Sequence, residues 1–85
     1  MMATDSKGKE LNIGDSVLYV NKEPTAFTLR GTVANIVPIC MAFGEIQYMV
    51  DVKVEFVNKN PVKESIVRVW SGQLVKYDTE RTIFV

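Results

Sequence analysis

The sequence predicts a small all-β domain whose five or six short strands bend into a barrel. Period-two alternation of apolar and polar residues dominates the chain together with β-branched residues, whereas helical periodicity is nearly absent. At 85 residues the chain has room for one domain and one modest core. Hydrophobic residues make up 47% of it, which is enough apolar content to fold.

Turn-forming residues delimit the predicted strands. The first strand covers 16–20 and is entered through Gly14-Asp15. The second covers about 28–37, where Gly31 predicts a bulge or a sharp bend. The third strand, 47–57, is the clearest, because it alternates between two faces. One face carries Tyr48, Val50, Val52, Val54 and Phe56, which we expect in the core, and the other carries Asp51, Lys53 and Glu55.

The second half of the chain continues the same pattern. A turn at 58–61 joins the third strand to a fourth at about 62–70, and a break at 71–73 precedes a short fifth strand at 74–77. Residues 1–10 are predicted to be a flexible polar lead-in, 11–77 the barrel, and 78–85 a tail or an added edge strand. An immunoglobulin-type sandwich needs about seven strands. A five-stranded OB barrel is the alternative architecture, although it often includes a helix.

The residue inventory argues against catalysis. The chain has no histidine, so the commonest general acid-base group is missing, and Cys40 has neither a histidine to activate it nor a second cysteine. No metal-ligand cluster and no phosphate-cradling glycine loop are present in the sequence. We therefore expect no enzyme activity, no cofactor, no metal and no small-molecule substrate.

Charge and cysteine content narrow the environment and the partners. Lys plus Arg number 10 and Asp plus Glu number 10, so the net charge is zero, which disfavours a dedicated nucleic-acid-binding domain. A single cysteine, the lack of a signal peptide and the lack of a bilayer-spanning run predict a cytoplasmic protein that does not enter a membrane.

Two sequence elements carry a family resemblance. Gly14-Asp15-Ser16-Val17, with Gly31-Thr32-Val33 later, is similar to the Gly-Asp-x-Val and Gly-x-Val elements of KOW-type barrels. The segment 70–75 (WSGQLV) is similar to the one-turn helix before the last strand of such barrels. Over about residues 11–77 the chain thus resembles the SH3-like barrel superfamily in its KOW-like variant. This resemblance implies an SH3-like fold and a transcription- or translation-associated RNA-binding role.

Two places are candidates for a binding surface. The segment 38–44 is too apolar for an ordinary loop, so it either forms an exposed contact site or folds back over the core or extends the second strand. Exposure would favour a protein partner or self-association. Trp70 either lies outward beside Arg68 as an interaction hot spot or caps one end of the barrel.

The sequence favours a non-enzymatic module that acts through protein-protein contacts. The predicted partner-binding residues are Phe27, Arg30, Ile39, Met41, Phe43, Arg68 and Trp70. One alternative is a KOW-like nucleic-acid-binding domain that uses Arg30, Lys53, Arg68 and Trp70. Another is a small inhibitor of a host enzyme, of the kind that phages and other viruses encode.

Overall fold

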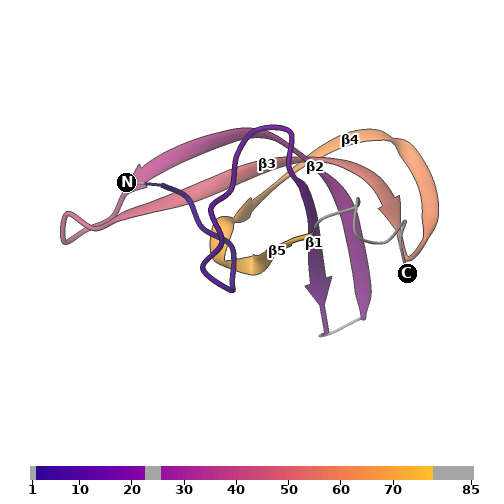
Figure 1. Ribbon diagram of the computed structural model, residues 1–85, viewed down its shortest axis with the longest axis horizontal. Helices are drawn as coiled ribbons and strands as arrows, with labels where there is room; N and C mark the ends of the chain where they lie inside the picture. The colour runs from indigo at the N-terminus through magenta and orange to yellow at the C-terminus, as the bar shows by residue number, and fades with distance from the viewer. Residues whose placement is uncertain (1, 23–25, 78–85) are drawn as a thin grey trace.

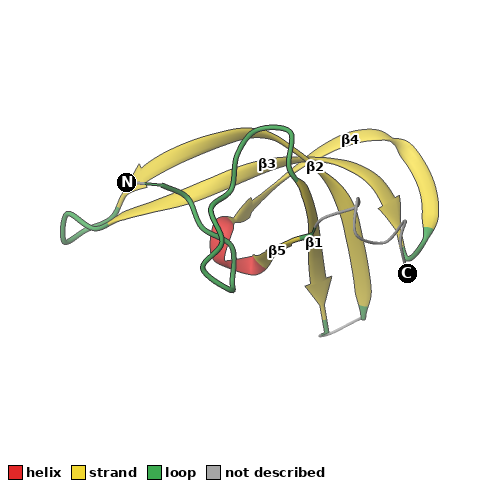
Figure 2. Cartoon of the chain, in the orientation of Figure 1, coloured by secondary structure: helices red, strands yellow, loops and turns green. Residues whose placement is uncertain are grey.

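The computed structural model describes residues 2–22 and 26–77 (Figure 1). One sheet contains five antiparallel strands in the order β4-β3-β2-β1-β5, which confirms the predicted all-β class. A single turn of 3-10 helix, η1, precedes the last strand as expected (Figure 2). The edge strand that the sequence suggests within 78–85 lies outside the described residues. The elements are β1 (Ser16–Asn21), β2 (Phe27–Cys40), β3 (Ile46–Val57), β4 (Asn60–Trp70), η1 (Ser71–Gln73) and β5 (Leu74–Lys76).

The sheet bends strongly but stays open. Its two edges are β4 and β5, and η1 leads from the end of one to the start of the other (Figure 1). Within residues 2–22 and 26–77, no hydrogen-bonded ladder joins these two edges. The structure is therefore an open, curled five-stranded sheet, and the barrel expected from the sequence is not closed.

The concave side of the sheet holds a core made mainly of valines. Val17, Val33 and Val50 are almost completely buried, as is Leu74 at the start of β5. Tyr19, Ile36 and Tyr48 pack against this cluster while remaining partly exposed. The predicted alternation along β3 is confirmed from Tyr48 to Val54, because these side chains face inward at every second position. The remaining cluster members are Ala3, Leu11, Val52 and Val69.

Gly31 marks the bulge that its position in the sequence predicts. The pairing of β2 with β3 shifts register between Arg30 and Gly31, and Glu55 is left without a partner on β2. A Cβ at Gly31 would clash with the carbonyl oxygen of Lys53 and lie 2.9 Å from Val52 Cγ1. Only glycine lets the two backbones approach this closely.

The bulge corrects one predicted core residue. One extra residue in a strand reverses the side to which the following side chains point. Phe56 therefore pairs with Arg30 and leaves the core, although Val54 on the other side of Glu55 is buried. The alternation seen in the sequence continues to Phe56, but the side-chain direction does not.

The N-terminal segment differs from the expected flexible lead-in. Ala3 and Leu11 belong to the core, and a backbone bridge pairs Thr4 with Glu10. The carboxylate of Asp5 is buried, with 4% of the residue exposed. It accepts hydrogen bonds from three backbone N–H groups, those of Lys7 and Lys9 on Oδ1 and that of Lys76 in β5 on Oδ2. These bonds hold the segment against the sheet, so the domain includes it.

Replacing Gly31 with alanine is expected to lower the free energy of unfolding by about 1–3 kcal/mol, because the added Cβ forces the β2 and β3 backbones apart. Gly72→Ala is the control, since a Cβ there meets nothing within 4 Å. Urea denaturation followed by circular dichroism measures both variants. Equal stabilities of the two variants would contradict the close approach at Gly31.

Asp5 gives the fold a dependence on acid pH. Burial raises the pKa of its carboxyl group, but the hydrogen bonds from the three backbone N–H groups together lower the pKa by more than burial raises it. The net pKa therefore lies below its usual value. Asp5 therefore stabilises the fold fully above the unfolded-state pKa of about 3.9, and this contribution is lost as pH falls through the lower folded-state pKa.

Asp5→Asn places an amide N–H group opposite one of the backbone N–H donors. We therefore expect the substitution to lower the free energy of unfolding by about 1–3 kcal/mol at pH 7. The variant should also lose less stability than the wild type between pH 5 and pH 2. Glu64→Gln, at a side chain that is 72% exposed, is the control. Parallel pH profiles of the wild type and Asp5→Asn would show that Asp5 does not supply this dependence.

Candidate functional site

A two-stranded arm extends from the sheet. The ends of β2 and β3 pair from Ile36 opposite Val50 to Cys40 opposite Ile46, and residues 36–50 are called the hairpin arm below. At its tip the N–H of Met41 donates to the Glu45 carbonyl at 2.7 Å, and the N–H of Gly44 donates to the Met41 carbonyl at 3.0 Å. Figure 1 shows the arm projecting away from the rest of the sheet.

The hairpin arm includes the apolar segment 38–44 and defines its secondary structure. Residues 38–40 extend β2, which was one of the alternatives, and only residues 41–45 form the connecting turn. Gly44 at φ 79° adopts the left-handed conformation that this tight turn needs. The segment is therefore both strand and exposed tip.

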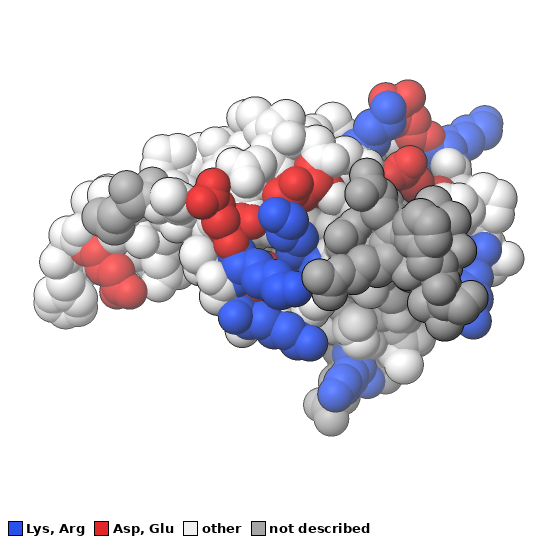
Figure 3. All heavy atoms as spheres, viewed as in Figure 1, with Lys and Arg blue, Asp and Glu red and all other residues white. Residues whose placement is uncertain are grey.

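The surface of the hairpin arm is apolar and accessible. Phe43 at the tip is 100% exposed and Ile46 is 39% exposed, while Ile39 and Met41 are half-buried. Cys40 is also exposed. Glu45 is the only charged residue of the arm, and the projecting end in Figure 3 is accordingly almost free of charge.

Trp70 lies at the base of the arm, where β4 ends opposite Met49. It is half-buried and lines an open hollow of about 390 Å³, called the Trp70 hollow below. Met2, Ile46 and Tyr48 contribute to the same hollow. Ile46, Gln47 and Tyr48 belong to the arm and also line the Trp70 hollow, so the two features adjoin. Trp70 therefore neither stands fully exposed nor caps a closed end.

The other predicted partner-binding residues lie elsewhere. Phe27 packs its ring against Tyr19 at the β1–β2 end of the sheet, with ring centroids 6.0 Å apart. Arg30 stacks its guanidinium carbon 4.0 Å from the centroid of the Phe56 ring. Of the seven predicted residues, the structure places Ile39, Met41 and Phe43 on the hairpin arm and Trp70 at its base.

Most of the cations proposed for nucleic-acid binding form ion pairs with acidic side chains. Arg68 Nε donates to Asp51 Oδ1 at 2.7 Å, and Lys53 Nζ lies 3.3 Å from Glu64 Oε1. The hydrogen bond from Arg68 lowers the pKa of the Asp51 carboxyl group, and the Asp51 carboxylate raises the pKa of Arg68 in turn. Arg30 is the one cation of that predicted set with no salt bridge among the described residues.

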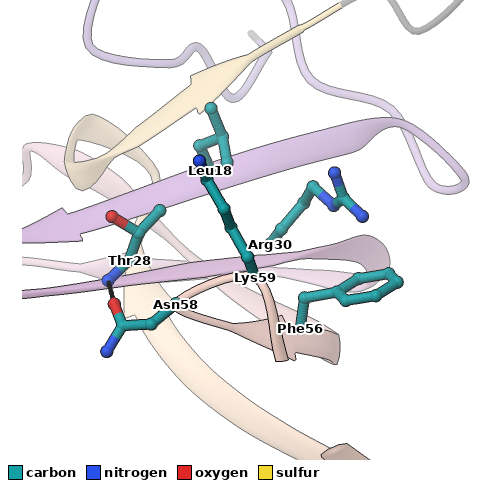
Figure 4. Close-up of a pocket in the computed structure, with 6 residues that line it drawn as sticks. All are labelled: Leu18, Thr28, Arg30, Phe56, Asn58 and Lys59. Atoms are coloured by element: carbon teal, nitrogen blue, oxygen red, sulfur yellow. Dashed lines mark hydrogen bonds between the residues drawn. The ribbon is translucent and has the colours of Figure 1, made fainter. Parts of the chain in front are cut away.

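A second hollow lies beside the β3–β4 turn (Figure 4). It has a volume of about 360 Å³ and is called the outer hollow below. Its lining combines two cations, an aromatic ring and an aliphatic side chain with two polar groups. The lining residues are Leu18, Thr28, Arg30, Phe56, Asn58 and Lys59.

The turn that borders the outer hollow has a defined geometry. Asn58 and Lys59 connect β3 to β4 with φ angles of 51° and 71°, the two positive values of a type I′ hairpin turn. The side-chain oxygen of Asn58 accepts a hydrogen bond from the backbone N–H of Thr28 at 2.9 Å. The backbone N–H of Asn58 donates in turn to the Thr28 carbonyl at 2.9 Å. These bonds fix the turn against β2.

Sequence reasoning identified the turn and the bulge but not the hollow between them. Lys59 carried one available signal, because the second position of a two-residue hairpin turn usually holds glycine. Phe56 had been assigned to the core by its alternation with Val54. Only the register of β2 against β3 shows that Phe56 and Arg30 meet.

Comparison of the chain with protein-family models, with curated proteins and with solved structures finds no match. Among the residues that the structure describes, no helix is long and apolar enough to cross a membrane. The same residues contain no group of three or more His, Cys, Asp or Glu side chains placed to hold a metal ion.

The left-handed backbone conformation of Lys59 predicts how glycine at this position would change the stability of the fold. Lys59→Gly should raise the free energy of unfolding by about 0.5 kcal/mol, because glycine avoids the cost of a left-handed backbone while losing some of this gain to unfolded-state entropy. Lys63→Gly is the control, since it lies within β4, where glycine weakens a strand. Thermal denaturation measures both. A loss of stability in Lys59→Gly would contradict the turn geometry.

Proposed function

We propose that this chain is a non-enzymatic binding module that contacts a protein partner through the hairpin arm and the Trp70 hollow. The observation that carries the proposal is Phe43, which is 100% exposed at the end of a hydrogen-bonded ribbon. A fully exposed aromatic ring on an ordered projection gains nothing for the isolated fold, whereas aromatic side chains supply much of the energy of protein interfaces.

The composition of the arm favours a protein surface as its partner. A single charge among residues 36–50 means that few ions need to be desolvated on contact. Methionine and aromatic side chains adapt to a partner surface, and Met41 and Trp70 supply both kinds. Backbone pairing from Ile36 to Cys40 also holds the arm in place before binding, which reduces the entropy lost on association.

The nucleic-acid alternative has weaker support. Arg68 and Lys53 are paired with acidic side chains, which reduces the positive charge available to phosphates. On the face seen in Figure 3, Asp and Glu side chains also lie directly beside the central group of Lys and Arg side chains. The resemblance to KOW-type barrels remains the only argument for RNA. An inhibitor of a host enzyme would be one particular case of the protein-binding module proposed above.

The proposal predicts the effect of changing the arm tip. Phe43→Ser should weaken binding of a partner captured by the wild-type chain at least tenfold, while thermal stability stays unchanged because the ring is fully exposed. Ile13→Ser is the matched control, as Ile13 is 67% exposed and lies outside the arm and the Trp70 hollow.

The measurement is affinity capture from the native cell with and without nuclease, followed by titration of the captured protein. Sedimentation velocity of the chain alone reports whether the partner is a second copy. Capture that depends on nucleic acid, or equal binding by Phe43→Ser and the wild type, would overturn the proposal.

A further inference from the structure

The outer hollow holds two cations that have no acidic partner. Arg30 and Lys59 both line it, and no salt bridge joins either one to an acidic residue among residues 2–22 and 26–77. None of the lining residues that lie within the described part of the chain is acidic. Glu55, the nearest carboxylate along β3, accepts a hydrogen bond from Thr32 Oγ1 at 2.8 Å instead. Among its described residues the hollow therefore carries two positive charges and no negative one, on a chain whose net charge is zero.

The backbone at Lys59 is a second, independent observation. Lys59 occupies a left-handed position at φ 71°, where glycine would be less strained. Its side chain extends from the turn toward Leu18 and lines the hollow (Figure 4). A strained residue that carries a charge into a hollow is the pattern expected where function, rather than folding, selects the side chain.

Arg30 is stacked on an aromatic ring. Its guanidinium lies 4.0 Å from the centroid of the Phe56 ring, and stacking of this kind restrains the long side chain. Figure 4 shows Arg30 and Phe56 side by side at one end of the hollow, with the Asn58–Thr28 hydrogen bond at the other. A guanidinium that has few conformations to lose binds two oxygens of an oxyanion at low entropic cost.

We propose that the outer hollow binds a small phosphate monoester, with the phosphate between Arg30 and Lys59 and an apolar body against Leu18 and Phe56. A phosphate monoester carries about −1.5 to −2 charges at neutral pH, which matches two unpaired cations better than a single carboxylate does. A volume of about 360 Å³ lies at the small end of the range for ligand pockets.

A small ligand fits this site better than a nucleic-acid strand. A strand needs a continuous track of unpaired cations, and the neighbouring Lys53 and Arg68 are engaged with Glu64 and Asp51. The site also shares no lining residue with the Trp70 hollow, and none of its residues belongs to the hairpin arm. The ligand site and the proposed protein contact are thus separate and can fail separately.

Phenyl phosphate is the probe, titrated into the isotope-labelled full chain in a phosphate-free buffer at pH 7.5 and followed by ¹H–¹⁵N correlation spectra. Saturable shifts are expected for the amide signals of Thr28, Phe56 and Asn58, with smaller effects from inorganic phosphate, benzoate and phenol. Lys59→Gly and Arg30→Gln should each weaken binding about tenfold, since each removes one charge-assisted contact. Lys63→Gln, which removes a cation outside the lining, should bind like the wild type.

Lys59→Gly keeps the test free of folding artefacts, because glycine suits the turn. Unsaturable shifts, or equal affinities of the wild type and Lys59→Gly, would overturn the site. Inorganic phosphate binding as tightly as phenyl phosphate would overturn the role of the apolar body, and tighter binding of benzoate would overturn the charge argument. Tighter binding of a single-stranded oligothymidylate would assign the site to nucleic acid instead.

Discussion

The close approach of the β2 and β3 backbones at Gly31 is the constraint on which both faces of this sheet depend. No side chain fits between Gly31 and the Lys53 carbonyl, so the strands meet there without a spacer. The adjacent bulge leaves Glu55 unpaired and increases the local bend and twist. The inward valines before the bulge and the outward Phe56 after it both follow from this arrangement. The irregular pairing at Gly31 thus lies between the buried side chain of Val54 and the side chain of Phe56, which lines the outer hollow.

A second interaction, made by Asp5, joins the N-terminal segment to the edge strand β5 of the open sheet. The Asp5 carboxylate accepts hydrogen bonds from three backbone N–H groups in two segments that are far apart in the sequence. These groups belong to Lys7 and Lys9 and to Lys76 in β5, the edge strand that pairs with β1. Buried carboxylates are tolerated when they accept several hydrogen bonds. The N-terminal segment that these hydrogen bonds hold contributes Ala3 and Leu11 to the core. This contribution matters because the domain has few large side chains to bury.

The two candidate surfaces use different physical means. The hairpin arm presents apolar side chains on a paired ribbon with one charge, and the outer hollow presents two unpaired cations beside an aromatic ring. Both are positioned by β3, the arm by its first half and the hollow by its last residues. The pairing of the long strands β2 and β3 connects both surfaces to the core that lies between them.

The sequence by itself determined the all-β class, the succession of strands along the chain, the turn at Asn58, an irregularity (bulge or bend) at Gly31 and the lack of histidine. These features are local, since alternation, turn residues and glycine act on neighbouring backbone. It also indicated Met41, Phe43 and Trp70 as contact candidates through their unusual positions. The hydrogen-bonding role of Asp5, however, depends on residues 71 positions away along the chain.

Only the tertiary structure decided which side each residue faces after the bulge, that the N-terminal segment packs, and that the sheet stays open. The physical reason is that these outcomes depend on register and on pairing between distant segments, which a single sequence does not display. Phe56 illustrates the difference, because the sequence shows its alternation with Val54 while the register places it under Arg30.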